Sequence, residues 1–110
     1  MIDVVALGEL LIDFAAKSTD ASGYPTMAAN PGGAPGNFLA ALNAYGKKTA
    51  FLGKVGNDAF GHLLLGTLKA ACIETKGIVV DDSVFTTLAF VTFDENGDRS
   101  FSFARKPGAD

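Results

Sequence analysis

Residues 2–8, Ile-Asp-Val-Val-Ala-Leu-Gly, form a nearly continuous apolar run that ends at a glycine. A strand that is buried on both faces has this pattern, because neither side of it alternates with polar residues. Two shorter runs of the same kind follow at about residues 50–53 and 77–80. We therefore expect these three runs to be strands of one parallel sheet.

Two helices are predicted between these strands. Apolar residues at helical spacing predict one helix over residues 37–45, which Gly46 ends. The same spacing predicts a second helix over about residues 58–72, with Asn57 or Asp58 as its N-cap. Strands that alternate with helices are typical of a right-handed, parallel α/β sheet.

The last part of the chain departs from this alternation. Extended runs at residues 88–93 and 100–103 flank an Asn-Gly pair, which is a strong signal for a hairpin. Residues 10–14 are also expected to be extended, whereas the polar residues 17–31 are expected to be a loop with one short strand. The predicted fold is thus α/β: a partial parallel sheet with flanking helices, plus a small antiparallel sheet.

Composition excludes several classes of protein. With 110 residues, 48% of them hydrophobic, and a formal charge of −3, the chain is not a disordered segment. It has no Lys/Arg run, so no nucleic-acid partner is expected. Acidic residues interrupt the first apolar stretch, unlike a signal peptide, and no run approaches the roughly 18 apolar residues of a membrane span. We expect a cytoplasmic protein without a membrane partner.

The side chains that commonly bind metals or form disulfides are few. Cys72 is the single cysteine, which excludes an intramolecular disulfide, and we expect it to be a small buried helix residue. His62 is the single histidine and is expected at the surface of the second helix. No metal site is predicted in the chain.

The densest turn chemistry lies at residues 31–37, Pro-Gly-Gly-Ala-Pro-Gly-Asn. Its spacing matches neither a Walker P-loop nor a dinucleotide fingerprint. Paired glycines before a helix let a ligand approach the backbone, and the helix N-terminus offers free N–H donors. The Asn37 amide both donates and accepts, as a sugar hydroxyl does, so the segment fits a sugar. The alternative is a structural turn with Asn37 as a helix cap.

Asp13 and Arg105 are the charged residues with a candidate role. Asp13 follows the first strand, and ligands of open α/β sheets bind beyond the carboxyl ends of strands. A carboxylate there can accept hydrogen bonds from two hydroxyls of a polyol, although a merely solvated carboxylate is an equal alternative. Residues 53–58 are expected to be loop and cap, and Arg105 is expected at the surface.

Residues 8–13, 31–37, 53–61 and 103–110 form four motifs whose order resembles the N-terminal part of ribokinase-like (PfkB) carbohydrate kinases. Residues 53–61 carry the pattern Gly-x-x-Gly-x-Asp-x-x-Gly. The Ala-Pro pair within residues 31–37 stands where ribokinases usually have a Lys-containing segment, which favours the fructokinase branch.

The resemblance implies a large α/β domain that is closed by a small β-sheet lid, with the sugar between them. Residues 1–110 would be the N-terminal part of this kinase, with lid segments at about 12–30 and 87–105 inserted in the α/β layer. The resemblance places seven residues at the sugar: Asp13, Gly32, Gly33, Asn37, Ala89, Phe103 and Arg105.

The implied activity is transfer of the γ-phosphate of ATP to a sugar hydroxyl, with Mg²⁺, and fructose is the favoured sugar. The catalytic base of the family is the Asp of a Gly-Ala-Gly-Asp segment, which does not occur here, so we expect it beyond Asp110, with most of the ATP and Mg²⁺ site. The 110-residue chain alone is expected to be inactive and to supply only the sugar-binding half.

Three alternatives stay open at this point. The first is a kinase for 2-keto-3-deoxygluconate, whose carboxylate Arg105 could meet, and the second is a nucleoside kinase. The third is a non-catalytic module that binds sugar or dimerises. We expect the lid to be covered either by a second subunit, in a homodimer through the lid, or by a C-terminal half beyond these residues, because an isolated two-stranded hairpin is marginal in water.

Overall fold

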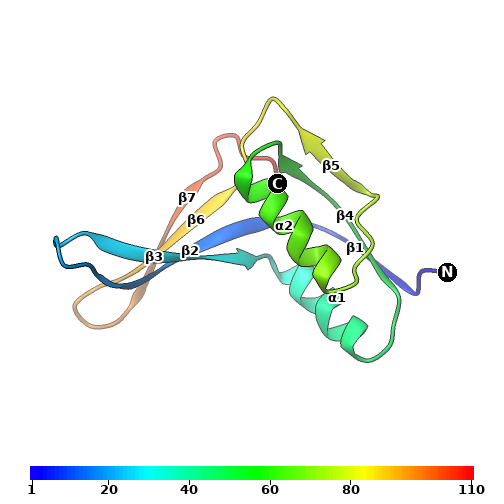
Figure 1. The fold of residues 1–110 in the computed structure, drawn as a ribbon, viewed down its shortest axis with the longest axis horizontal. Coiled ribbons are helices and arrows are strands. Elements are labelled where there is room, and N and C mark those ends of the chain that lie inside the picture. Colours follow the sequence, from blue (N-terminus) through cyan, green and yellow to red (C-terminus); the bar gives the residue numbers. More distant parts are fainter.

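A computed structural model describes all residues of the chain, Met1–Asp110, as two sheets and two helices (Figure 1). The first sheet has three parallel strands in the order β1-β4-β5. Its strands are β1 (Val4–Leu7), β4 (Thr49–Gly56) and β5 (Ile78–Asp81). Helix α1 (Ala34–Ala44) precedes β4, and helix α2 (Ala59–Ala70) follows it. Neither helix is long and apolar enough to cross a membrane.

The second sheet has four strands in the order β3-β2-β6-β7 and extends from the α/β layer like an arm (Figure 1). Its strands are β2 (Leu11–Thr19), β3 (Pro25–Gly32), β6 (Leu88–Phe93) and β7 (Arg99–Ala104). The outer pairings, β2 with β3 and β6 with β7, are antiparallel. The central pairing of β2 with β6 is parallel, since both strands leave the α/β layer in the same direction.

Both helices cover the same face of the three-stranded sheet and share one hydrophobic core. The buried core residues are Leu10, Ile12, Leu39, Phe51, Val55, Leu64, Leu68, Ile73 and Ile78. On the opposite face of the sheet, Val5 is 52% exposed and Leu7 is 79% exposed. The expected burial of the first strand on both faces is therefore found on one face only, because no element of these residues covers the other.

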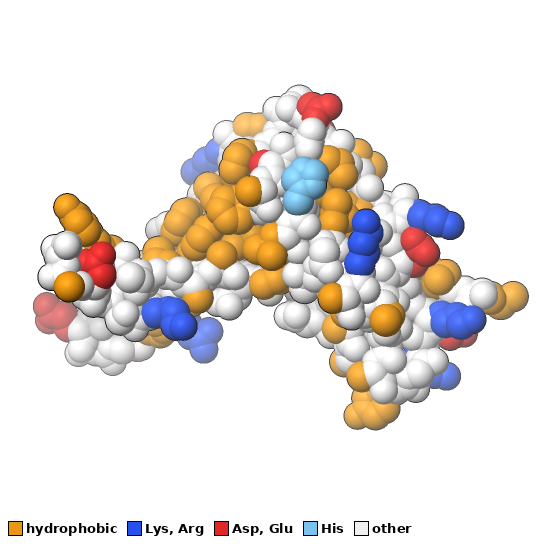
Figure 2. Space-filling model, in the orientation of Figure 1, with side chains coloured by type: hydrophobic (Ala, Val, Ile, Leu, Met, Phe, Trp, Pro, Cys, Tyr) orange, Lys and Arg blue, Asp and Glu red, His pale blue; other side chains and the backbone are white.

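Aromatic rings join the four-stranded sheet to α2. Phe14 on β2 stacks on Phe90 of β6 with 5.2 Å between ring centroids, and it meets Phe60 of α2 edge-on at 5.3 Å. Phe85 continues the contact, with its ring 6.3 Å from that of Phe60. Hydrophobic side chains gather on the visible face where the arm meets α2 (Figure 2). This packing fixes the direction in which the four-stranded sheet leaves the layer.

The loop predicted at residues 17–31 is shorter than expected, and the one short strand predicted within it is eight residues long. Strand β2 continues to Thr19, and β3 runs antiparallel to it from Pro25. The connecting turn is closed by Asp20, whose carboxylate accepts hydrogen bonds from the N–H groups of Ser22 and Tyr24, both at 2.9 Å. The pairing rests on backbone hydrogen bonds, so the side chains of this hairpin need not alternate between apolar and polar.

Helix α1 begins three residues earlier than predicted, with Gly33 as its N-cap. Pro35 lies in the first turn, where its missing N–H breaks no helical hydrogen bond. Asn37 therefore lies inside the helix and is not its cap. The C-terminal prediction is confirmed, since Gly46 follows the helix with a φ of 85°.

Cys72 is exposed, so its predicted burial in a helix is wrong. Helix α2 ends at Ala70, and Cys72 takes a left-handed φ of 60°. The Cys72 N–H donates to the carbonyl of Lys69 at 3.0 Å, and the Ile73 N–H donates to that of Leu68 at 3.0 Å. This is the Schellman pattern that turns the chain away from a helix end, and it points the cysteine outward.

Candidate functional site

Asp13 lies in a row of residues that crosses three strands of the four-stranded sheet. It pairs with Ala89 on β6, and Ala89 pairs with Phe103 on β7. Direct neighbours on adjacent strands point their side chains to the same face. Arg105 follows β7 and holds its guanidinium 4.6 Å from the centroid of the Phe103 ring. The structure thus brings four of the seven expected residues together on one face.

The Asp13 carboxylate lies directly against Gly32. A Cβ at Gly32 would overlap Oδ2 of Asp13, so this glycine makes room for the carboxylate. No hydrogen bond from the chain reaches the carboxylate. Burial raises the pKa of Asp13, and the negative charge of Glu9 raises it further. Asp13 is therefore a half-buried carboxylate whose acceptor sites are unused.

Gly33, which follows Gly32, has a backbone N–H that is not used within the chain. Its φ of 113° suits only glycine, and a Cβ there would lie 2.5 Å from the carbonyl oxygen of Glu9. No side chain caps the N-terminus of α1, and the Gly33 N–H donates to no acceptor in the chain. The space that a side chain at Gly33 would fill is occupied by the chain itself, so the fold requires this glycine whether or not a ligand binds.

Asn37 lies one turn into α1 with its side chain exposed. Together with Gly32 and Gly33 it lines a small cavity of about 70 Å³ between α1 and α2. Its amide makes no hydrogen bond with the rest of the chain. The structure thus gives two groups of expected residues, the row from Asp13 to Arg105 and the cavity group of Gly32, Gly33 and Asn37, and Gly32 links them because it lies against Asp13.

Two carboxylates that we did not predict contact Arg105. Arg105 Nη2 lies 3.3 Å from Glu9 Oε2 and 2.9 Å from Asp110 Oδ2. Glu9 joins β1 to β2 and is 96 positions from Arg105 in the sequence. Both acids stand in the first and last of the four motifs, but nothing in their local sequence shows that they meet.

The motif at residues 53–61 contains the end of β4 and the start of α2, so the loop expected at residues 53–58 is wrong for residues 53–56, which pair with β5, whereas the expected cap at Asp58 is confirmed. Asp58 caps the helix by accepting the Gly61 N–H at 2.8 Å. It also accepts the Thr86 N–H and the Thr86 hydroxyl, both at 2.8 Å. Burial opposes ionisation of Asp58, but these hydrogen bonds, with one from Phe60, outweigh it and hold the pKa of its carboxyl below the ordinary value. This carboxylate is satisfied within the fold.

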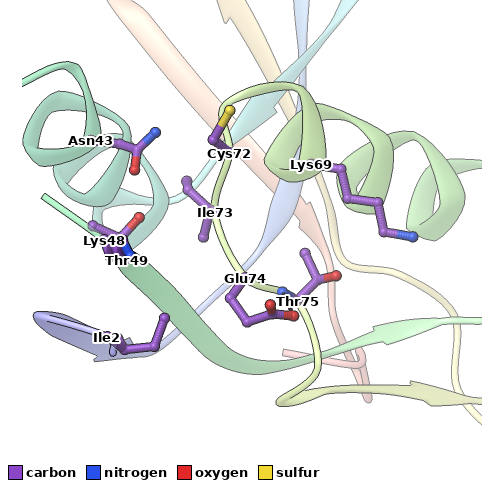
Figure 3. Close-up of a pocket in the computed structure, with 9 residues that line it drawn as sticks. All are labelled: Ile2, Asn43, Lys48, Thr49, Lys69, Cys72, Ile73, Glu74 and Thr75. Atoms are coloured by element: carbon purple, nitrogen blue, oxygen red, sulfur yellow. Dashed lines mark hydrogen bonds between the residues drawn. The ribbon is translucent and has the colours of Figure 1, made fainter. Parts of the chain in front are cut away.

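A larger cavity of about 450 Å³ lies elsewhere, where α1 and α2 end (Figure 3). Asn43 contributes to its wall and donates to the carbonyl of Ala71 at 2.6 Å. Lys69 also contributes to the wall, but its side chain extends away from Asn43 and Ile73 (Figure 3). None of the seven expected residues lines this cavity, and its charged groups do not converge on one point.

Residues 1–110 match the profile of the pfkB family of carbohydrate kinases over their whole length. The chain therefore belongs to the pfkB family of carbohydrate kinases.

Fructokinases are among the relatives that it resembles. Over 109 residues the chain is 44% identical to fructokinase-2 of Solanum lycopersicum, covering 97% of this chain and 33% of that protein. The fructokinase structure from Xylella fastidiosa superposes with a TM-score of 0.90 at 38% identity, covering 97% of this chain and 33% of that one. The chain thus spans about a third of the length of these relatives.

Proposed function

We propose that the protein carrying this chain phosphorylates a hydroxyl of fructose with ATP, and that these residues supply the sugar-binding half of its active site. The relatives named fructokinases support the choice of sugar. The observation that carries the proposal is the set of unused acceptors on Asp13 beside the unused N–H of Gly33. A polyol supplies donors and acceptors to match both.

Each residue has a stated part in this binding. The Asp13 carboxylate accepts hydrogen bonds from two sugar hydroxyls, which are stronger than bonds between neutral groups. The Gly33 N–H, at the positive end of α1, donates to a hydroxyl oxygen, and the Asn37 amide can do either. The Phe103 ring, 48% exposed, offers an apolar surface to the C–H side of the sugar.

ATP, Mg²⁺ and the catalytic base are proposed to lie mostly outside these residues. Phosphoryl transfer depends on positioning and on charge stabilisation around the transferred group. The chain brings no three carboxylate, His or Cys side chains together as metal ligands, and it contains no Gly-Ala-Gly-Asp segment. A related fructokinase from Xylella fastidiosa is described with bound ATP, which supports ATP as the donor. A cytoplasmic location is part of this proposal.

A substrate panel with the complete protein tests the proposal. ADP release would be measured with fructose, 2-keto-3-deoxygluconate and a nucleoside, each with ATP and Mg²⁺. We expect the largest kcat/KM with fructose and no turnover by residues 1–110 alone. A preference for the sugar acid or the nucleoside would move the protein to another branch, and no turnover with any sugar would favour a module that only binds.

We also propose that the protein forms a homodimer through its four-stranded sheet. Phe93 and Phe101 are 53% and 50% exposed there, and every residue of β7 is exposed. Sedimentation of the complete protein would show a dimer, which Phe93→Ser should weaken. Tyr45→Ser is the control, because Tyr45 is 85% exposed at the C-terminal end of helix α1 and lies outside the four-stranded sheet. A monomer at all concentrations would contradict the dimer.

A further inference from the structure

Arg105 is the cation of the candidate site, and two carboxylates of the chain already face one of its nitrogens, while its Nε is buried without a hydrogen-bond partner. Its guanidinium lies over the Phe103 ring at 4.6 Å. One nitrogen, Nη2, faces two carboxylates, with Glu9 Oε2 at 3.3 Å and Asp110 Oδ2 at 2.9 Å. The positive charge of Arg105 is therefore compensated before any ligand arrives.

Asp110 is the better fixed of the two partners. Its side chain is 8% exposed, compared with 46% for Glu9. Its second oxygen accepts a hydrogen bond from the hydroxyl of Thr87, a residue without exposed surface. Gly108 allows this tight turn, because a Cβ there would lie 3.1 Å from the Arg105 Cα. The carboxylate is thus held in place from both sides.

The net charge around the row formed by Asp13, Ala89, Phe103 and Arg105 is negative. Glu9 and Asp110 face Arg105, and Glu9 also acts on Asp13, which has no cation of its own. A ligand carboxylate or phosphate at Arg105 would be repelled by Glu9 and Asp110 beside it, and by Asp13. A neutral hydroxyl meets no such obstacle and can donate to Asp13.

We propose that Glu9 and Asp110 are specificity-determining residues, which occupy Arg105 so that the site accepts neutral sugars and rejects sugars bearing a carboxylate or phosphate. The inference rests on the proposed function, since it assigns a selection rule to the same site. Both acids act through Arg105 and are positioning residues. Their negative charges would also weaken the binding of a sugar-acid carboxylate to Arg105.

Isosteric variants of the complete protein separate this role from a structural one. Glu9→Gln and Asp110→Asn each remove one negative charge, and the second keeps an oxygen for the Thr87 hydroxyl. Titration calorimetry would give the dissociation constants of fructose and of 2-keto-3-deoxygluconate. We expect each variant to raise the affinity for the acid relative to fructose by roughly 10-fold, because one negative charge beside Arg105 that repels the acid is removed.

Glu95→Gln is the matched control, because Glu95 carries the same charge at the exposed turn between β6 and β7 and makes no hydrogen bond through its side chain. An unchanged affinity ratio in two folded variants would overturn the inference while leaving the proposed function intact. An equal rise in Glu95→Gln would also overturn it, since net charge alone would then explain the effect. A wild-type protein that binds no neutral sugar would refute both proposals.

Discussion

The two helices of the chain begin in opposite ways. The N-terminus of α2 is closed by Asp58, whose carboxylate accepts from Gly61 and twice from Thr86. The N-terminus of α1 starts at Gly33 and has no side-chain cap. The start of α2 is thus satisfied within the fold, whereas the start of α1 leaves backbone N–H donors without a partner in the chain.

The carboxylates beside these two helix starts, Asp58 at α2 and Asp13 at α1, differ in the same way. The hydrogen bonds to Asp58 lower its pKa, so its ionised form stabilises the fold. Burial and the charge of Glu9 raise the pKa of Asp13, so its ionised form opposes folding. A group that costs stability in the free protein is a stronger candidate for ligand binding than one that the fold already satisfies.

Asp58→Ala should have the largest effect on stability. It removes the cap and leaves the Thr86 N–H without a partner, which together should lower the free energy of unfolding by about 3 kcal/mol. Urea unfolding of the complete protein measures this loss. Asp98→Ala, in the exposed turn between β6 and β7, is the control and should change it little. A similar small change in Asp58→Ala would mean that the closed helix start carries no special stability.

Asp13→Ala should act on binding and not on the fold. Loss of a charged acceptor should weaken fructose binding by about 1.5–3 kcal/mol, or roughly 10–150-fold, with ATP affinity unchanged. Calorimetry with each ligand measures both quantities. Equal fructose affinity in wild type and variant would remove Asp13 from the site.

The C-terminal ends of the two helices also differ, in the residue that takes the left-handed conformation. Gly46 ends α1 at a φ of 85°, but Cys72 ends α2 at a φ of 60°, where a side chain is strained. Cys72→Gly should therefore raise the free energy of unfolding by about 0.5–1 kcal/mol, after the added freedom of glycine in the unfolded chain is deducted. Thermal melts check this, with Ala70→Gly, inside α2, as a control that should destabilise. A loss of stability in Cys72→Gly would show that the cysteine makes contacts that outweigh its strain.

Replacing Asp58 or Asp13 by Asn should change the stability of the protein in opposite directions, and these are the smallest effects that we predict. Asp58 stabilises the fold above its ordinary pKa of 3.8, and this is lost as the pH falls through its lowered value. The ionised Asp13 costs stability above its raised pKa, and this cost disappears as the pH falls toward 3.8. At pH 7, Asp58→Asn should thus lower the melting temperature and Asp13→Asn should raise it slightly. Shifts of the same sign would contradict the contrast.

The alternation of strands and helices was predictable because each element has its own pattern. The apolar runs at β1, β4 and β5 and the Asn-Gly turn between β6 and β7 are local signals. The hairpin of β2 and β3 was predicted only in part, with its strands too short, because its outer part is polar and its strands form by pairing with each other. The start of α1 was missed because Pro35 and Gly36 resemble a turn, although a first helical turn tolerates both.

The candidate site was predictable only in part. Asp13, the glycines and Asn37 stand where strand ends and a helix start give physical reasons for binding. The roles expected for Ala89, Phe103 and Arg105 came from family resemblance alone. Glu9 and Asp110 were missed because their meeting at Arg105 depends on the tertiary fold, and an acid 96 positions away has no signal in a single sequence.

The central claim is that the open start of α1 binds the sugar, and the amide of Gly33 reports on it directly. Nitrogen-15 spectra of the complete protein would be recorded while fructose is added to saturation. We predict that the Gly33 amide resonance shifts in step with binding, while that of Gly61, whose N–H already donates to Asp58, stays in place. Saturable fructose binding that leaves the Gly33 resonance unmoved would contradict the account.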